Sequence, residues 1–145
     1  MNRSEQIKIV GAMGEQIVKE CLEKNGHSVT LSESQYDRVK DMVADGKTVE
    51  VKTFIEYVKY NSFGLKPNQW QKCDNVDRLF FVRVPLRRGE AVLVYESVSR
   101  KFDDQTLKDL RLYGLQDLEL YDTITDVQIC NRIYDLSPST WKGRL

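Results

Sequence analysis

Histidine and cysteine are scarce in this sequence of 145 residues, and their scarcity argues against several kinds of catalytic site. The single histidine, His27, disfavours zinc hydrolase chemistry and a Ser-His triad, and we expect it at a junction between a helix and a strand. The three cysteines, Cys21, Cys73 and Cys130, lie far apart and have no spacing typical of a zinc site. An odd number of cysteines without a signal peptide favours a reducing cytoplasm.

Long apolar runs and an excess of charge of one sign are also missing. No apolar stretch approaches the ~18 residues that a membrane-spanning helix needs. Lys and Arg number 22, and Asp and Glu also number 22, so the formal net charge is zero. Neutrality argues against a continuous positive coat for nucleic acid, but it is compatible with a local basic patch. The length and composition favour one globular domain over residues 1–145.

The hydrophobic pattern predicts an α/β fold with a mixed central β-sheet flanked by helices. A helix is expected over residues 4–24, where apolar residues recur at helical spacing and Asn25-Gly26 follows as a stop signal. The other expected elements are a strand over 27–31, a loop over 32–39, a hairpin over 41–54, a loop over 56–66, a helix over 67–76, strands over 78–84 and 90–96, and a helix over 103–114. Residues after 115 have no unambiguous pattern.

The hairpin places charged residues in an otherwise apolar strand. Asp45-Gly46 predicts a two-residue type I′ turn. In that register Asp41 faces Glu50, with β-carbons about 4.5–5.5 Å apart. Lys52 shares their face because strand side chains alternate. A three-residue turn breaks this convergence, and an exposed charged hairpin face is the alternative interpretation.

Two facing carboxylates repel each other, which makes a divalent cation between them a natural partner. Mg²⁺ uses one or two carboxylates and keeps open positions for water and phosphate oxygens. Lys52 then lies where it orients the attacking water or stabilises charge on a phosphate.

The pattern of Asp41 followed by Glu50-Val51-Lys52 resembles the motif of the PD-(D/E)XK nuclease superfamily. The proline that often precedes the aspartate in that family is replaced here by Lys40. The resemblance covers residues ~11–84 and implies a restriction endonuclease-like core of a helix, a three-stranded meander, a second helix and a fourth strand. The catalytic core is expected over about residues 4–96.

Two further site residues follow from the resemblance. Many members have a glutamate on the first helix, often after a glycine, and Gly14-Glu15 matches this position. The resemblance makes Glu15 a third metal ligand. Some members have a Gln or Lys on the second helix, where Gln69 matches best and Gln71 less well.

The resemblance implies Mg²⁺-dependent hydrolysis of DNA phosphodiester bonds, with Mn²⁺ as a substitute. A site-specific endonuclease of restriction or homing type is the first interpretation, and a Holliday junction resolvase is the second. Repair or phage-type nucleases, an RNA-directed nuclease and a non-catalytic nucleic-acid-binding module remain alternatives. The retention of Asp41, Glu50 and Lys52 favours an enzyme.

Cutting both strands favours a symmetric oligomer, a homodimer or homotetramer. Residues 97–145 are expected to serve substrate recognition or oligomerisation. The candidate DNA contacts are Lys59, Tyr60, Asn61, Lys66, Arg87, Arg88, Arg132, Lys142 and Arg144.

Overall fold

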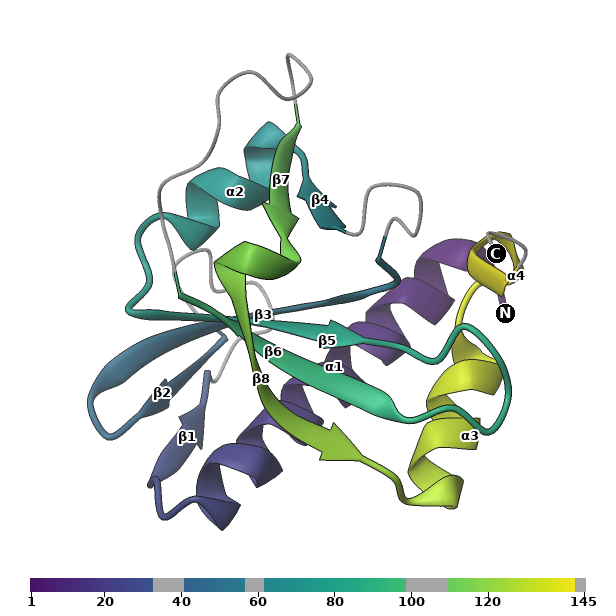
Figure 1. The fold of residues 1–145 in the computed structure, drawn as a ribbon, viewed down its shortest axis with the longest axis horizontal. Coiled ribbons are helices and arrows are strands. Elements are labelled where there is room, and N and C mark those ends of the chain that lie inside the picture. The colour runs from purple at the N-terminus through teal and green to yellow at the C-terminus, as the bar shows by residue number, and fades with distance from the viewer. Residues whose placement is uncertain (33–40, 57–61, 99–109, 143–145) are drawn as a thin grey trace.

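A computed structural model describes residues 1–32, 41–56, 62–98 and 110–142 of the chain. It has the expected α/β class, with a six-stranded mixed sheet packed against helices and a separate two-stranded sheet (Figure 1). The elements are α1 (Arg3–Lys24), β1 (Val29–Leu31), β2 (Met42–Ala44), β3 (Lys47–Phe54), β4 (Ser62–Leu65), α2 (Pro67–Cys73), β5 (Arg78–Arg83), β6 (Val92–Ser97), β7 (Arg111–Gly114), the 3₁₀ helix η1 (Leu115–Asp117), β8 (Leu118–Ile124), α3 (Val127–Leu136) and α4 (Ser139–Lys142). Within these described ranges, no helix combines the length and the apolar character needed to cross a membrane.

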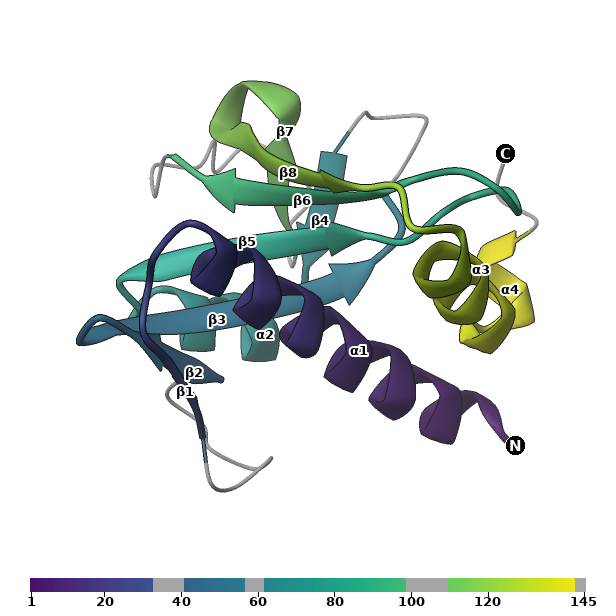
Figure 2. The same cartoon turned by 90° about the horizontal axis from the view of Figure 1, so that it is seen from below.

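Helix α1 confirms the first predicted helix and begins one residue earlier. The Asn2 side chain accepts a hydrogen bond from the N–H of Glu5 and caps the first turn. Gly26, with a φ of 89°, follows the last turn in the left-handed conformation that glycine favours there. The buried residues of the helix are Val10, Gly14, Ile17, Val18, Cys21 and Leu22. Figure 2 shows α1 crossing the sheet alongside β3 and β5.

The β2–β3 hairpin has the register that the Asp-Gly turn predicts. Ala44 pairs with Lys47, and Met42 pairs with Val49, where the pairing of the two strands ends. The expected direct pair of Asp41 with Glu50 is not part of it, because the backbone N–H of Asp41 donates to the carbonyl of Val49. Asp45 and Gly46 have φ values of 49° and 80°, the positive values that a type I′ turn requires at both central residues.

The strand order of the large sheet is β1-β2-β3-β5-β6-β8. Strands β3 and β5 are parallel, whereas all other neighbours are antiparallel. The predicted order of a helix, three strands, a helix and a fourth strand is therefore present, with β4 inserted before α2.

Two apolar cores lie on opposite faces of the large sheet. One core joins α1 and α3 to residues of β3, β5 and β6 that include Val49, Val51 and Phe80. The second joins α2, β4 and β7 to the alternate residues Leu79 and Phe81 of β5. Because strand side chains alternate, Glu50 and Lys52, which pair with Leu79 and Phe81, face the second core.

Two sequence-based predictions are wrong in this second core. The expected loop over 56–66 contains strand β4, and the end of the expected helix over 103–114 is strand β7. The two strands pair with each other and bury Phe63, Leu65 and Tyr113. No local pattern reveals this pairing, because its partners lie far apart in the sequence. Residues 57–61 and 103–109 lie outside the described residues.

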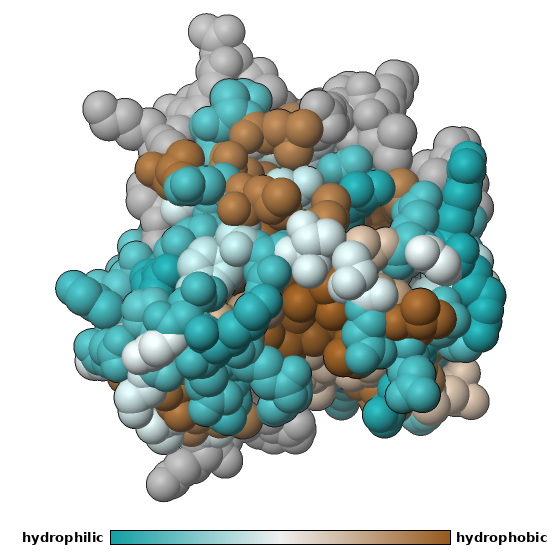
Figure 3. Space-filling model, turned by 60° about the horizontal axis from the view of Figure 1, so that its bottom comes forward, coloured by the Kyte–Doolittle hydropathy of each residue, from teal (hydrophilic) through white to brown (hydrophobic). Residues whose placement is uncertain are grey.

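The C-terminal part of the chain extends the large sheet. Strand β8 pairs with β6, and α3 packs beside α1. Hydrophilic residues cover much of the face in Figure 3, and apolar residues surface in separate areas. The exposed large apolar side chains are Met1, Ile7, Leu31, Val98, Leu115, Leu120 and Val127. A role of residues 97–145 in recognition or oligomerisation stays a prediction.

Candidate active site

The candidate site lies where short strand β2 ends beside the longer β3. Within the described residues, the pairing of β2 with β3 covers only Lys47, Thr48 and Val49 of the longer strand. Asp41 then bonds to both residues that flank Glu50. Its backbone N–H donates to the carbonyl of Val49 at 2.9 Å, and its Oδ2 accepts from the N–H of Val51 at 2.8 Å. The carboxylate of Asp41 thereby takes the place of a strand partner and is held beside Glu50.

Glu50 is a buried carboxyl group in the middle of β3, with its side chain only 2% exposed. Burial raises the pKa of Glu50, and the hydrogen bond and charge of nearby Asp41 raise it further. Two lysines oppose this effect. Lys52 Nζ lies 3.7 Å from Oε1 of Glu50, and Lys72 Nζ lies 3.1 Å from Oε2.

Lys72 is the site residue that the sequence analysis missed. Its ammonium group lies 3.5 Å from Oδ1 of Asp41 as well as 3.1 Å from Glu50. Burial acts to lower the pKa of Lys72, but the charges of Glu50 and Asp41 outweigh it and raise the pKa. Lys72 is therefore a protonated, positively charged partner of both carboxylates.

Gln69, the predicted helix residue, is engaged elsewhere. Its side-chain oxygen accepts a hydrogen bond at 3.0 Å from the backbone N–H of Lys66 and closes the first turn of α2. Lys72 follows Gln69 by three residues, which places the two on one side of the helix. That spacing is the signal that could have identified Lys72. A catalytic role of Gln69 stays a prediction that this contact does not support.

Glu15 reaches the same cluster from α1. Gly14 permits this, because a Cβ there would lie 1.8 Å from Oγ1 of Thr53 on β3. Burial raises the pKa of Glu15 from 4.5 to about 7, and the charge of Asp41 and a hydrogen bond to it add to the rise. Lys72 and Lys52 act in the opposite direction. The structure thus brings Glu15, Asp41, Glu50, Lys52 and Lys72 together.

The donor set of this cluster fits a hard divalent cation that keeps open positions. Within residues 1–32, 41–56, 62–98 and 110–142, no group of three or more His, Cys, Asp or Glu side chains is arranged to hold a metal ion by itself. Mg²⁺ commonly takes only one or two carboxylates and completes its shell with water and phosphate oxygens. The buried Oε2 of Glu50 is a carboxylate oxygen whose nearest cation is the ammonium group of Lys72, at 3.1 Å. Asp41 and Glu50 are the residues that would hold the ion, and Glu15 as a third ligand stays a prediction.

The predicted DNA contacts are only partly described, and most of those described lie apart from the carboxylates. Lys59, Tyr60, Asn61 and Arg144 fall outside the described residues. Lys66 is exposed at the start of α2. Arg87, Arg88, Arg132 and Lys142 follow β5 or lie on α3 and α4, beyond the far end of the sheet from the β2–β3 turn (Figure 1).

Two of these basic side chains have local partners. Arg88 forms an ion pair with Asp135. The ammonium group of Lys142 lies 4.8 Å from the ring centre of Tyr134 and donates to the carbonyl of Asp135 at 3.3 Å. The structure does not bring these four basic side chains, Arg87, Arg88, Arg132 and Lys142, together with the carboxylate cluster.

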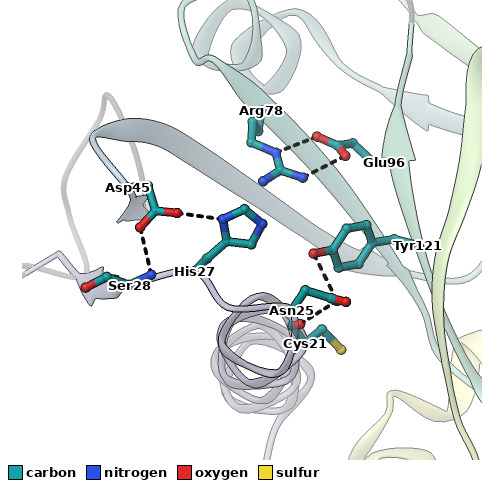
Figure 4. A network of polar contacts seen from close by, with 8 residues as sticks. All are labelled: Cys21, Asn25, His27, Ser28, Asp45, Arg78, Glu96 and Tyr121. Carbon is teal, nitrogen blue, oxygen red and sulfur yellow. Dashed lines mark hydrogen bonds and ion pairs between the residues drawn. The ribbon is translucent and has the colours of Figure 1, made fainter.

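His27 confirms its expected position between α1 and β1 and helps to hold the hairpin (Figure 4). Its Nδ1 lies 2.7 Å from Oδ2 of Asp45, whose Oδ1 accepts from the N–H of Ser28 at 2.8 Å. These bonds attach the β2–β3 turn to the end of α1. Across the sheet, Arg78 donates two hydrogen bonds to Glu96, at 2.7 and 2.9 Å.

Comparisons with known proteins add no family to this geometry. No family model, curated protein or solved structure matches the chain.

Proposed function

We propose that this protein is a Mg²⁺-dependent endodeoxyribonuclease that hydrolyses phosphodiester bonds. The observation that carries the proposal is the meeting of Asp41, Glu50 and Lys52 at one edge of β3, with Glu15 supplied by α1. A buried Glu50 whose pKa is raised by burial and by Asp41 is typical of a functional site.

Each residue of the cluster has a distinct task in this proposal. Asp41 and Glu50 would hold the ion, which would supply Lewis-acid activation of water and neutralise charge on the phosphate. The Glu15 carboxyl, with a pKa of about 7, accepts a proton from the attacking water at its Oε atoms. Lys52 Nζ, 3.7 Å from Glu50 Oε1, donates to a phosphate oxygen and stabilises its developing charge.

DNA is the proposed substrate because the motif of Asp41, Glu50 and Lys52 resembles that of the PD-(D/E)XK nucleases. A site-specific enzyme of restriction or homing type remains the first interpretation. A Holliday junction resolvase is the second, and the zero net charge argues against the broad basic surface that four DNA arms require. The three cysteines are buried and form no disulfide bond, which supports a reducing cytoplasm as the location.

A homodimer or homotetramer is proposed for cutting both strands. Val98, Leu115 and Leu120 are 57%, 39% and 52% exposed. The N–H of Val98 bonds to the carbonyl of Asp117, which precedes β8, the edge strand that carries Leu120. We propose the edge strand β8, with its exposed Leu120, as the surface for self-association. Sedimentation of Leu120→Lys beside the unaltered protein tests it, and an unchanged oligomer contradicts this choice of surface.

The experiment that tests the activity incubates the protein with Mg²⁺ and linear duplex, four-way junction or single-stranded DNA in parallel. Cleavage of duplex at defined sites supports the first interpretation, and selective cleavage of the junction supports a resolvase. The control is Glu50→Gln, which keeps the side-chain shape and removes the charge. The proposal is contradicted if Glu50→Gln cleaves DNA as well as the unaltered protein does. It is also contradicted if the unaltered protein cleaves none of the three substrates with Mg²⁺ or Mn²⁺.

A further inference from the structure

Lys72 lies between the two carboxylates that would hold the ion. Its Nζ is 3.1 Å from Oε2 of Glu50 and 3.5 Å from Oδ1 of Asp41. The other oxygen of each carboxylate has a different neighbour. Oδ2 of Asp41 accepts a hydrogen bond from the N–H of Val51, and Oε1 of Glu50 lies near Lys52. The ammonium group therefore occupies the position at which both carboxylates can share one cation.

The position of Lys72 is set by the anchoring of α2. Cys73, the next residue, is fully buried in the second core. The Trp70 ring packs against the same core and lies 4.0 Å from the guanidinium carbon of Arg111, which forms an ion pair with Asp74. The helix thus holds the Lys72 backbone in place, while the long side chain keeps the freedom to move its ammonium group.

Lys52 differs from Lys72 in the oxygen that it approaches. It lies beside Oε1 of Glu50, at 3.7 Å, and is carried by the same strand as that glutamate. Lys52 can therefore remain in place when Asp41 and Glu50 bind a cation through their other oxygens. Lys72 cannot, because two cations at one position repel each other strongly at the edge of a protein interior.

We propose that Lys72 is a built-in counter-ion that a divalent cation must displace before it binds Asp41 and Glu50. The inference rests on the proposed metal-dependent function and adds a regulatory property to the same site. In the metal-free protein Lys72 neutralises part of the charge of the buried carboxylates and so prevents their repulsion. It also weakens metal binding, since the ion competes with an ammonium group that is already present.

The first test measures Mn²⁺ binding by calorimetric titration in the absence of DNA. Lys72→Met keeps the length of the side chain and removes the charge, and we expect it to bind Mn²⁺ at least about tenfold more tightly than the unaltered protein. Lys47→Met removes an exposed positive charge from the same strand as Glu50 and is expected to bind as the unaltered protein does. Equal or weaker binding by Lys72→Met overturns the inference and leaves the proposed function standing. Absence of Mn²⁺ and Mg²⁺ binding by every protein, Lys72→Met included, overturns both.

A second test uses the unaltered protein and so does not depend on the folding of a variant. Brief treatment with an amine-reactive acetylating reagent, followed by peptide mass measurement, reports how accessible each lysine is. We expect saturating Mg²⁺ to increase the labelling of Lys72 several-fold and to leave Lys47 unchanged as an internal control. Labelling of Lys72 that is unchanged or slower at a Mg²⁺ concentration shown by titration to saturate the site overturns the inference.

Discussion

The carboxylate of Asp41 accepts a hydrogen bond at 2.8 Å from the backbone N–H of Val51. This bond lies one residue beyond Glu50 and two before Thr53 along β3, at the edge that β2 leaves uncovered. The Asp41 side chain therefore has two roles, as a hydrogen-bond partner of β3 and as a charged member of the cluster. Different substitutions of Asp41 can test the two roles separately.

Asp41→Asn and Asp41→Ala are expected to differ in stability but not in activity. Asparagine keeps an oxygen that accepts from the N–H of Val51, whereas alanine leaves that N–H without its partner, at a cost of about 1–3 kcal/mol. Both variants lose the ligand charge, and we expect both to lose cleavage while DNA binding survives. Urea unfolding and a cleavage assay measure the two effects. Near-normal cleavage by Asp41→Asn would show that Asp41 is not part of the active site.

Lys52→Ala is expected to abolish cleavage and to leave the melting temperature within a few degrees of that of the unaltered protein. The ion pair of Lys52 with Glu50 spans 3.7 Å, and without Lys52 the buried Glu50 keeps the ammonium group of Lys72 at 3.1 Å, so the loss of folding free energy is small. Lys47→Ala, at an exposed position of the same strand, serves as the control and should retain activity. A large fall in melting temperature for Lys52→Ala alone would identify a structural lysine instead.

Gly14→Ala is expected to destabilise the protein, and Gly11→Ala is not. A Cβ at residue 14 would lie 1.8 Å from Oγ1 of Thr53, whereas one at residue 11 would meet no described atom within 4 Å. Forcing α1 away from β3 costs about 1–3 kcal/mol. Alanine at residue 11 should instead stabilise the helix by about 0.5–1 kcal/mol.

The free energies of unfolding of these two glycine variants, measured in urea, make the comparison. Gly14→Ala should also lower cleavage, because Glu15 moves with the helix. Equal stabilities of the two variants would contradict the close packing of α1 on β3.

Without metal, the protein is expected to lose stability as the pH rises from about 5 to about 8. The Glu15 carboxyl has a pKa raised from 4.5 to about 7 in the folded state. Between these values the folded protein binds more protons than the unfolded chain, so its free energy of unfolding falls with increasing pH. The raised pKa of Glu50 acts in the same direction.

Glu15→Gln tests this origin, since glutamine does not titrate. Its melting temperature should depend less on pH across the same interval than that of the unaltered protein, and Glu5→Gln on the exposed first turn is the matched control. Glu15→Gln should also lower cleavage by more than about tenfold, or ~1.4 kcal/mol of transition-state stabilisation. An unchanged pH profile would show that Glu15 is not held in the cluster.

Local signals in the sequence determined the elements that surround the site. Apolar residues at helical spacing and Asn25-Gly26 predicted α1, and Asp45-Gly46 predicted the register of β2 and β3. These signals succeed because a helix stop and a type I′ turn depend on the conformations of neighbouring residues. That turn sets the register as far as the pair of Met42 with Val49, and the bonds of Asp41 to Val49 and Val51 then hold its carboxylate beside Glu50.

Tertiary packing alone decided the rest of the cluster. Glu15 reaches it only because Gly14 permits contact with Thr53, and Lys72 reaches it only because α2 is anchored by Cys73 in the second core. That core depends on the pairing of β4 with β7, whose residues are distant in the sequence and carry no local signal of each other. Helical spacing in the sequence indicates that Gln69 and Lys72 lie on the same side of α2. The position of α2 on the sheet decides which of the two contacts the carboxylates.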